Sequence, residues 1–339
     1  MHENPLLLLH ETVGKHYNRM KESLLVLFGI ISTISSAQVI PSDKGFVDYR
    51  IETKNDTINF YIYNPKKTIK KHLFIHIDGS YPAPLWIETN PCCATLDPFN
   101  YNLIPEDYAY IVISKHGFPF SDRENFKIPK NFWEKNTLEF RVERANQVIK
   151  YIQKNIFKPE EIVVVGTSQG TDVTAKLATL NKDITKIGFW AGGGLPQLME
   201  FIMFARKDAI ADKITEIEAT KRIDSLLVQF EKMFDNPSPK EMWDGNSYLS
   251  YVSFSEPPVE NLLKLDIPIY LAIGTKDENI AVENSYIIPI EFIRHRKKNL
   301  TFRQFPNYDH GFVEKLESGE EIDRFDEVTK DFINWIIEK

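Results

Sequence analysis

Short runs of β-branched and aromatic residues recur along this chain and are separated by longer, more polar stretches. An apolar run bounded by turn residues is typical of a strand that is buried on both faces of a sheet. Runs of this kind lie at 73–77, 108–113, 162–165, 267–273 and 300–305. The sequence therefore predicts a sheet of buried strands.

Two of the intervening stretches have the character of helices. Residues 134–155 predict one amphipathic helix, and residues 171–180 are compatible with a second helix that carries small side chains. The apolar positions of the first helix recur at helical spacing: Leu138, Val142, Ala145, Val148, Ile149 and Ile152.

The residues Gly166-Thr167-Ser168-Gln169-Gly170 lie where the strand run at 162–165 meets the stretch at 171–180. A G-x-S-x-G pattern in a sharp strand-to-helix turn is typical of a nucleophile elbow, in which the serine has a strained backbone conformation. Glycine at both ends lets the strand and the helix pack closely. Ser168 would then stand at the sheet edge, beside the backbone N–H of Gln169. An incidental surface turn is the alternative.

A serine nucleophile needs an acid and a base, and one common arrangement places the acid and then the base after the serine. Asp277 comes just past the strand run at 267–273, where a carboxylate is well placed to orient an imidazole. His310 follows the last predicted strand, on a loop before a terminal helix. Glu278 is a minor alternative to Asp277, and an ordinary turn aspartate is the non-catalytic alternative. Asp309 adjoins His310 and is poorly placed to meet its ring.

With the elbow, the acid and the base in this order, the chain resembles the α/β-hydrolase superfamily across nearly everything after residue 45. The resemblance implies a mostly parallel central sheet with helices on both faces. It also implies Ser168 as nucleophile, Asp277 as acid and His310 as base. The segment around Asp277 and His310 is similar to dienelactone-hydrolase-type and prolyl-oligopeptidase-type catalytic domains. A mechanism of this kind requires no cofactor.

An oxyanion hole requires two N–H donors, and the backbone N–H of Gln169 is the first. The second comes from the loop after the third core strand, for which residues 78–82 and 115–119 are the candidates. The later loop contains His116-Gly117-Phe118-Pro119, which resembles an H-G-x-P signature of several hydrolase families.

The strand count decides between the two loops. Because residues 134–155 predict a helix, no strand remains between the run at 108–113 and the elbow strand, so that run is the fourth strand. We therefore expect the second donor to be the N–H of Ser80, with Gly79 as the alternative. The His116-Gly117 pair is expected to shape the pocket rim.

Residues 195–262 are the segment in which this chain departs most from the minimal fold, because the core fold needs only a short crossover there. Two amphipathic helices in this segment are otherwise highly charged, which suits a helical cap over the carboxyl edge of the sheet. Met199 and Met203 widen the apolar face of the first helix. We predict that they line a substrate pocket with Tyr81. A helix that is buried on two sides would produce the same pattern.

The beginning of the chain has the pattern of a secretory leader. Basic residues flank Met20, the stretch from Leu24 to Ile34 is apolar, and Ser35-Ser36-Ala37 provides small residues before the next segment. Such a stretch is a signal peptide rather than a membrane span. We expect residues 1–37 to be a leader with Met20 as a possible start, and the mature protein to be periplasmic or secreted without stable membrane insertion. A short membrane anchor or a poorly ordered tail is the alternative.

About 300 residues follow the leader, which is the upper end of a single domain. We expect residues 38–339 to form the α/β-hydrolase domain, with the cap inserted at about 195–262. The formal net charge of −7 excludes an electrostatic nucleic-acid footprint. No CxxC motif or His/Cys cluster predicts a metal site. The adjacent Cys92 and Cys93 bridge only with strain, so two thiols are favoured over a vicinal disulfide.

These features together predict an exported serine hydrolase that cleaves a carboxylic ester through an acyl-enzyme intermediate. Its partner is then a small-molecule ester or a short peptide, since a peptidase or aminoacyl hydrolase of prolyl-oligopeptidase-like type is the first alternative. A non-catalytic binding protein on a hydrolase scaffold is an alternative of a different class. Such proteins usually lose the serine or the histidine, whereas Ser168, Asp277 and His310 are all present.

Overall fold

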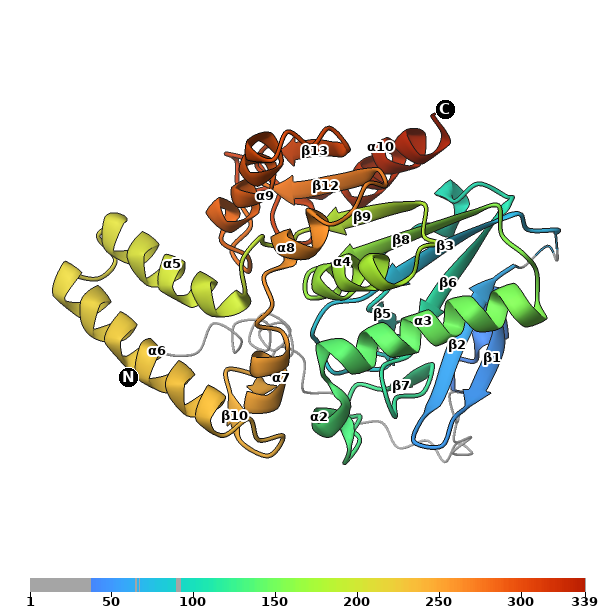
Figure 1. The fold of residues 1–339 in the computed structure, drawn as a ribbon, viewed down its shortest axis with the longest axis horizontal. Helices are drawn as coiled ribbons and strands as arrows, with labels where there is room; N and C mark the ends of the chain where they lie inside the picture. The colour runs from blue at the N-terminus through green and yellow to red at the C-terminus, as the bar shows by residue number, and fades with distance from the viewer. Residues whose placement is uncertain (1–37, 65, 67, 90–92, 339) are drawn as a thin grey trace, which may run out of the picture. The chain divides into compact units, whose positions relative to one another are not determined.

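An eight-stranded sheet forms the centre of the fold, in the order β1-β2-β6-β3-β8-β9-β12-β13 (Figure 1). The hairpin of β1 and β2 pairs antiparallel with β6, and the remaining neighbours are parallel. The strands are β1 (Phe46–Glu52), β2 (Thr57–Tyr63), β3 (His72–Ile77), β6 (Tyr108–Ile113), β8 (Glu161–Thr167), β9 (Lys186–Trp190), β12 (Ile269–Gly274) and β13 (Leu300–Phe305). The predicted mostly parallel sheet is confirmed.

The structure is a computed structural model that describes residues 38–64, 66, 68–89 and 93–338. The predicted leader at 1–37, with its possible start at Met20, and Cys92 of the cysteine pair lie outside the described residues. Within the described part of the chain, no helix is both long enough and apolar enough to cross a membrane.

The apolar runs that the sequence singles out are strands β3, β6, β8, β12 and β13. Strand β12 begins at Ile269 rather than Ile267, because Pro268 has no N–H to donate to a neighbouring strand. Strand β6 is the fourth strand of the sheet along the chain and lies between β2 and β3. The strand count behind the choice of oxyanion loop is therefore confirmed, whereas the β1–β2 hairpin and β9 were not predicted.

The helix predicted over 134–155 is two helices, α2 (Phe132–Lys135) and α3 (Leu138–Asn155). The break lies at Thr137, whose side-chain oxygen accepts a hydrogen bond from the N–H of Phe140 (3.3 Å). A hydroxyl in this position caps the first turn of a new helix. Thr137 therefore marks the true start of the long amphipathic helix.

Helices cover both faces of the sheet, as predicted (Figure 1). Successive residues of β3 and β8 point to opposite faces, so they belong to different core clusters. Ile75 and Val164 pack in the cluster that includes residues of α3, α4 (Gly170–Leu180) and α9 (Val282–Arg294). Phe74 and Val163 pack on the other face with Phe332 of α10 (Phe325–Ile337).

Shorter elements surround this sheet. Strands β4 (Trp86–Glu88), β5 (Cys93–Thr95) and β7 (Ser121–Arg123) form a three-stranded sheet, and β14 (Val313–Lys315) pairs with β15 (Glu321–Asp323). Two 3₁₀ helices are η2 (Pro41–Lys44) and η3 (Tyr101–Leu103).

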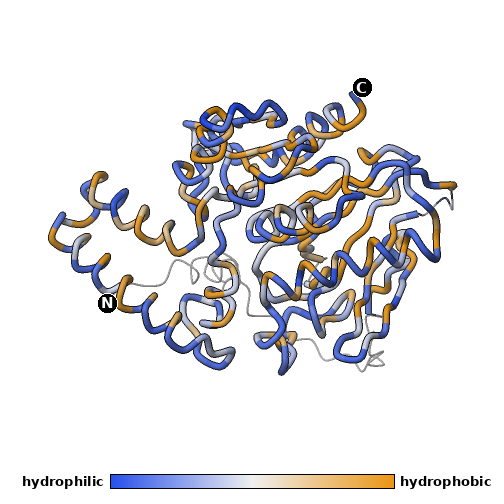
Figure 2. Tube along the Cα trace, viewed as in Figure 1, coloured by the Kyte–Doolittle hydropathy of each residue, from blue (hydrophilic) through white to orange (hydrophobic). Residues whose placement is uncertain are grey.

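The predicted cap segment forms α5 (Gln197–Ile210), α6 (Glu216–Asp235), the hairpin of β10 (Met242–Trp243) with β11 (Asn246–Ser247), and α7 (Tyr248–Ser253). We call these elements the cap. Hydrophobic and polar residues alternate along α5 and α6 (Figure 2). The buried members of the cap's own hydrophobic cluster are Leu226, Phe230, Met233 and Tyr251. Helix α8 (Pro258–Leu262), which the predicted boundary included in the cap, packs into the main core instead.

We predict that Met233→Ala destabilises the cap and that Phe234→Ala does not. Met233 is fully buried in the cap cluster, whereas Phe234 is 50% exposed on the same helix. Removal of a buried methionine side chain typically costs about 2–5 kcal/mol, whereas surface changes stay within about 0.5 kcal/mol. Denaturant unfolding followed by circular dichroism measures both variants. Equal losses of stability in the two variants would contradict the observed packing of α6.

Candidate active site

Ser168 stands in a sharp turn between β8 and α4, with a φ of 52°. This left-handed conformation is uncommon for a residue with a side chain. The glycines on either side are required: a Cβ on Gly166 would collide with the carbonyl of Gly170, and a Cβ on Gly170 would collide with the backbone of Ile77. The N–H of Ser168 is bonded to the carbonyl of Trp190 on β9 (3.0 Å). The turn therefore has the geometry of a nucleophile elbow.

Asp277 lies in the turn that follows β12, and its Oδ2 is 2.8 Å from Nδ1 of His310. Its other oxygen, Oδ1, accepts hydrogen bonds from the N–H groups of Asn279 (2.9 Å) and Ile280 (2.8 Å). The buried carboxylate is thus held in one orientation. Because an ionised carboxylate accepts and does not donate, Nδ1 of His310 carries the proton and Nε2 is the basic nitrogen.

The elbow, Asp277 and His310 follow β8, β12 and β13, whose carboxyl ends meet at one edge of the sheet. The topology therefore brings the three predicted residues to the same edge. Among the described residues, no hydrogen bond joins Ser168 Oγ to the ring of His310. Catalytic hydrogen bonds often become short only when substrate is bound.

Neither alternative acid is available to His310. Asp309 uses Oδ1 to accept the N–H groups of Gly311 (2.9 Å) and Val313 (3.0 Å), which stabilises the turn that carries the histidine. The side chain of Glu278 is 84% exposed. Asp277 is therefore the acid that the geometry supports.

The proposed oxyanion donors lie beside Ser168. Gln169 is the N-cap residue of α4, and Ser80 lines the same cavity as Ser168 and Gln169. A Cβ on Gly79 would stand 3.1 Å from Cβ and 3.5 Å from Oγ of Ser168, so the backbone of this loop approaches the serine closely. The loop after β3, rather than the loop after β6, reaches the serine.

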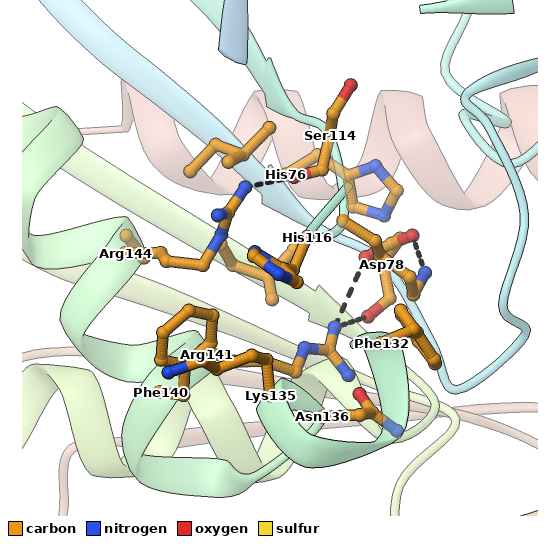
Figure 3. A pocket seen from close by; sticks show the side chains of 14 residues that line it. His76, Asp78, Ser114, His116, Phe132, Lys135, Asn136, Phe140, Arg141 and Arg144 are labelled. Carbon is orange, nitrogen blue, oxygen red and sulfur yellow. Dashed lines mark hydrogen bonds and ion pairs between the residues drawn. The ribbon is translucent and has the colours of Figure 1, made fainter. Parts of the chain in front are cut away.

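A buried ionic cluster holds the oxyanion loop in place (Figure 3). The carboxylate of Asp78 pairs with Lys115 and with Arg141 of α3. Arg141 also donates to the carbonyl of Asp78 (2.5 Å) and to Oε1 of Gln169 (3.0 Å). Burial by itself would raise the pKa of Asp78, but Lys115 and Arg141 hold the pKa below its ordinary value. One guanidinium thus connects the oxyanion loop to the elbow.

A second polar network contacts the residue before Ser168. The ring of His76 on β3 is 3.0 Å from Oγ1 of Thr167, the residue before Ser168. The other ring nitrogen of His76 is 3.3 Å from Asp97, which also accepts a hydrogen bond from Tyr101 (2.9 Å). His76 is a positioning residue for the elbow.

The His116-Gly117 pair does not shape the rim of the Ser168 cavity. His116 binds Asp56 (2.7 Å) and lines the cavity drawn in Figure 3, and Gly117 lines a surface depression near residues 53–59. The prediction that this loop shapes the pocket rim is wrong, because β6 lies on the side of β3 away from the elbow strand β8.

The Ser168 cavity is more polar than the sequence predicted. Gln197 and Glu200 of α5 line it from the cap, and Leu195 and Phe254 line it from the adjoining segments. Tyr81 and Met199 are exposed, and Met203 is half-buried on α5; the structure does not bring these three residues to the cavity. Among the described residues, no cluster of His, Cys, Asp and Glu could hold a metal ion.

Two acidic side chains line this cavity. Burial raises the pKa of Asp172 on α4 to about 7. Burial, together with the carboxylates of Asp172 and Asp277, raises the pKa of Glu200 to about 8. Both carboxyl groups therefore stay protonated at pH values far above the ordinary pKa range of carboxylic acids.

Sequence reasoning missed several charged residues around the site: Asp78, Lys115, Arg141, Asp172 and Glu200. A signal existed for Arg141, which lies at helical spacing between Leu138 and Ala145 on the apolar face of α3. A charge inside an apolar stripe needs a buried partner. Glu200 lies off the apolar stripe of α5, so no periodicity predicts its burial.

The chain has the α/β-hydrolase fold. Residues 245–338, which contain Asp277 and His310, match the model of the dienelactone hydrolase family. No curated protein matches the chain.

Solved structures share the fold at low sequence identity. Est1E from Butyrivibrio proteoclasticus, with ferulic acid bound, aligns at 18% identity and TM-score 0.54 over 86% of this chain and 100% of that chain. An esterase from Pyrococcus furiosus aligns at 14% identity and TM-score 0.53 over 88% and 93%. An acylaminoacyl peptidase from Pyrococcus horikoshii aligns at 12% identity and TM-score 0.53, over 87% of this chain but 41% of the peptidase.

We predict that Glu200→Gln stabilises the protein at alkaline pH. With its pKa raised to about 8, folded Glu200 keeps a proton that the unfolded chain loses at lower pH. Its contribution to stability is therefore complete below the ordinary carboxyl pKa and is lost as pH rises toward 8. Glutamine does not ionise, so the variant should gain on the order of a few kcal/mol over the wild type between pH 5 and pH 8.5.

Denaturant unfolding at the two pH values measures this gain. Glu231→Gln, an exposed substitution on α6, is the matched control and should show the pH dependence of the wild type. If Glu200→Gln also follows the wild-type pH dependence, Glu200 is ionised in the folded protein and the prediction is wrong.

Proposed function

We propose that this protein is an exported serine hydrolase that cleaves carboxylic esters through an acyl-enzyme intermediate. One observation carries the proposal: Ser168 occupies a left-handed elbow at the same sheet edge as the hydrogen-bonded Asp277–His310 pair. This combination is the arrangement that activates a serine nucleophile.

In the first half of the proposed reaction, Ser168 Oγ attacks the ester carbonyl and His310 Nε2 takes the serine proton. Asp277 keeps the ring in the required tautomer and stabilises the imidazolium. The carbonyl oxygen becomes an oxyanion that accepts hydrogen bonds from the N–H groups of Gln169 and Ser80. The tetrahedral intermediate then collapses, the alcohol leaves with the proton from His310, and the acyl group stays on Ser168.

In the second half, water replaces the alcohol. His310 takes a proton from the water as its oxygen attacks the acyl carbonyl, and the same N–H groups stabilise the second oxyanion. The proton then returns to Ser168 Oγ as the carboxylic acid departs. Every proton transfer uses His310, and no external redox partner or cofactor enters the balance.

We favour an ester as the substrate for two reasons. The similar protein Est1E has been solved with ferulic acid bound, and the similar Pyrococcus furiosus protein is named an esterase. The similarity to an acylaminoacyl peptidase supports hydrolysis of a peptide or aminoacyl bond as the second candidate. Side-by-side assays with p-nitrophenyl esters and aminoacyl-arylamides distinguish the two. Export is proposed from the signal-peptide pattern at 20–37 alone.

We predict that Ser168→Ala reduces kcat for p-nitrophenyl ester hydrolysis by roughly 10⁴-fold or more. The substitution removes the attacking oxygen but leaves the fold and the oxyanion donors in place. The same variant should no longer be labelled by a fluorophosphonate probe, and its circular dichroism spectrum should match that of the wild type.

Ser318→Ala, which removes an exposed serine hydroxyl after β14, is the matched control and should retain activity and labelling. A Ser168→Ala variant that kept a tenth of the wild-type activity would rule out Ser168 as the nucleophile. A wild-type protein that neither turns over esters or arylamides nor reacts with the probe would instead be a binding protein on a hydrolase scaffold.

A further inference from the structure

Glu200 lines the cavity that also contains Ser168, and one of its carboxyl oxygens is buried and unpaired among the described residues. The residue is 3% exposed and lies in the first turn of α5. Its Oε1 accepts a hydrogen bond from Asn284 (2.8 Å), whereas Oε2 is buried without a hydrogen-bond partner among the described residues. An unsatisfied buried polar atom is costly, so it calls for an explanation in a native fold.

The surrounding structure fixes this orientation of Glu200. Asn284 is fully buried on α9 and is itself held by the backbone of Leu195, whose N–H donates to its Oδ1 (2.8 Å). A Cβ on Gly193 would stand 2.8 Å from Oε1 of Glu200 and would also collide with the Asn284 amide. Glycine at this position therefore makes room for the pair. The Asn284 bond thus holds the Glu200 carboxyl group in one position beside the cavity.

A second carboxyl group, that of Asp172, lines the same cavity from α4. Among the described residues, no basic side chain forms an ion pair with either Asp172 or Glu200. Arg141 lowers the pKa of Asp172 electrostatically but bonds to Asp78 and Gln169 instead. The cavity beside the nucleophile thus has two acidic groups and no cation of its own.

We propose that this cavity binds a protonated primary amine in the ester substrate, with Glu200 Oε2 and Asp172 as its acceptors. The inference rests on the proposed hydrolysis at Ser168. A primary ammonium group supplies the N–H donors that Oε2 lacks, and its positive charge offsets two neighbouring carboxylates. Esters of amino acids or amino alcohols have this chemistry.

Binding of the ammonium group releases a proton. When Glu200 enters the complex as a carboxylic acid, it loses its proton to solvent as the ion pair forms, and no bond of the substrate changes. The charged groups that act on Glu200 are Asp172 and Asp277, and both disfavour its ionisation in the absence of a cation. Selectivity for the amine should therefore increase from pH 6 to pH 8.5, a range in which alkyl amines remain protonated.

Matched ester pairs test the proposal. For the acyl part, p-nitrophenyl 3-aminopropanoate is compared with the butanoate, and the 6-aminohexanoate with the heptanoate. For the alcohol part, 6-aminohexyl benzoate is compared with heptyl benzoate. Each pair replaces an ammonium group by a methyl group. At pH 8, kcat/KM should favour the ammonium ester by about 10- to 100-fold in at least one pair, the range expected for hydrogen bonds to charged groups.

Glu200→Gln should reduce this ammonium-to-methyl ratio by about 10-fold or more, because the amide cannot become a carboxylate. Asp172→Asn is the second variant and should also lower the ratio. Glu231→Gln, an exposed change in the cap, is the matched control and should keep it. The pH dependence of the ratio in the wild-type protein provides a measurement that does not depend on the folding of any variant.

The outcomes separate the two proposals. Hydrolysis of the neutral esters without preference for any ammonium ester, or a preference that Glu200→Gln leaves intact, overturns the amine site and leaves the serine hydrolase in place. Absence of hydrolysis in every pair, together with no fluorophosphonate labelling, overturns the hydrolase and the amine site with it.

Discussion

The arrangement of the site depends on the buried carboxylate of Asp78. This group lies between Lys115, which follows β6, and Arg141 on α3, and the same guanidinium reaches the side chain of Gln169. Three separate segments are thereby tied to the loop that carries Gly79 and Ser80. Buried charges of this kind are interdependent, because loss of one partner leaves the others desolvated and unpaired. The cluster thus favours a single geometry for the oxyanion loop.

The strained serine is maintained by contacts on every side. The carbonyl of Ile77 approaches Gly170 so closely that no side chain fits between them. Thr167 is held by His76, and the N–H of Ser168 is bonded to β9. A left-handed residue costs free energy, so such backbone persists only where the surrounding packing determines it. The elbow, its supporting networks and the loop that carries Gly79 and Ser80 are therefore joined by hydrogen bonds and close packing.

The cap provides polar side chains to the Ser168 cavity rather than only an apolar cover. Its helices have their own hydrophobic cluster, so their largest apolar side chains pack against each other and not against the cavity. The first turn of α5 then places Glu200 at the cavity, held by Asn284 from the main domain. Met199 on the neighbouring position is exposed. If the proposed hydrolysis takes place at Ser168, the acidic side chains at this cavity would select substrates by charge as well as by shape.

The sequence alone predicted five of the eight strands of the main sheet, the elbow and the order of the proposed triad. Each is a local pattern: apolar runs specify buried strands, and paired glycines around Ser168 specify a sharp turn. It also selected the loop at 78–82, which the structure places beside Ser168, because the long helix before the elbow strand fixed the strand count. The tertiary structure decided which side chains meet. The position of Glu200 and Asp172 at the cavity, the bridge made by Arg141, and the position of Met199 and Met203 outside the cavity depend on how distant segments pack. Periodicity reports which face of a helix is apolar, but it carries no information about what that face will touch.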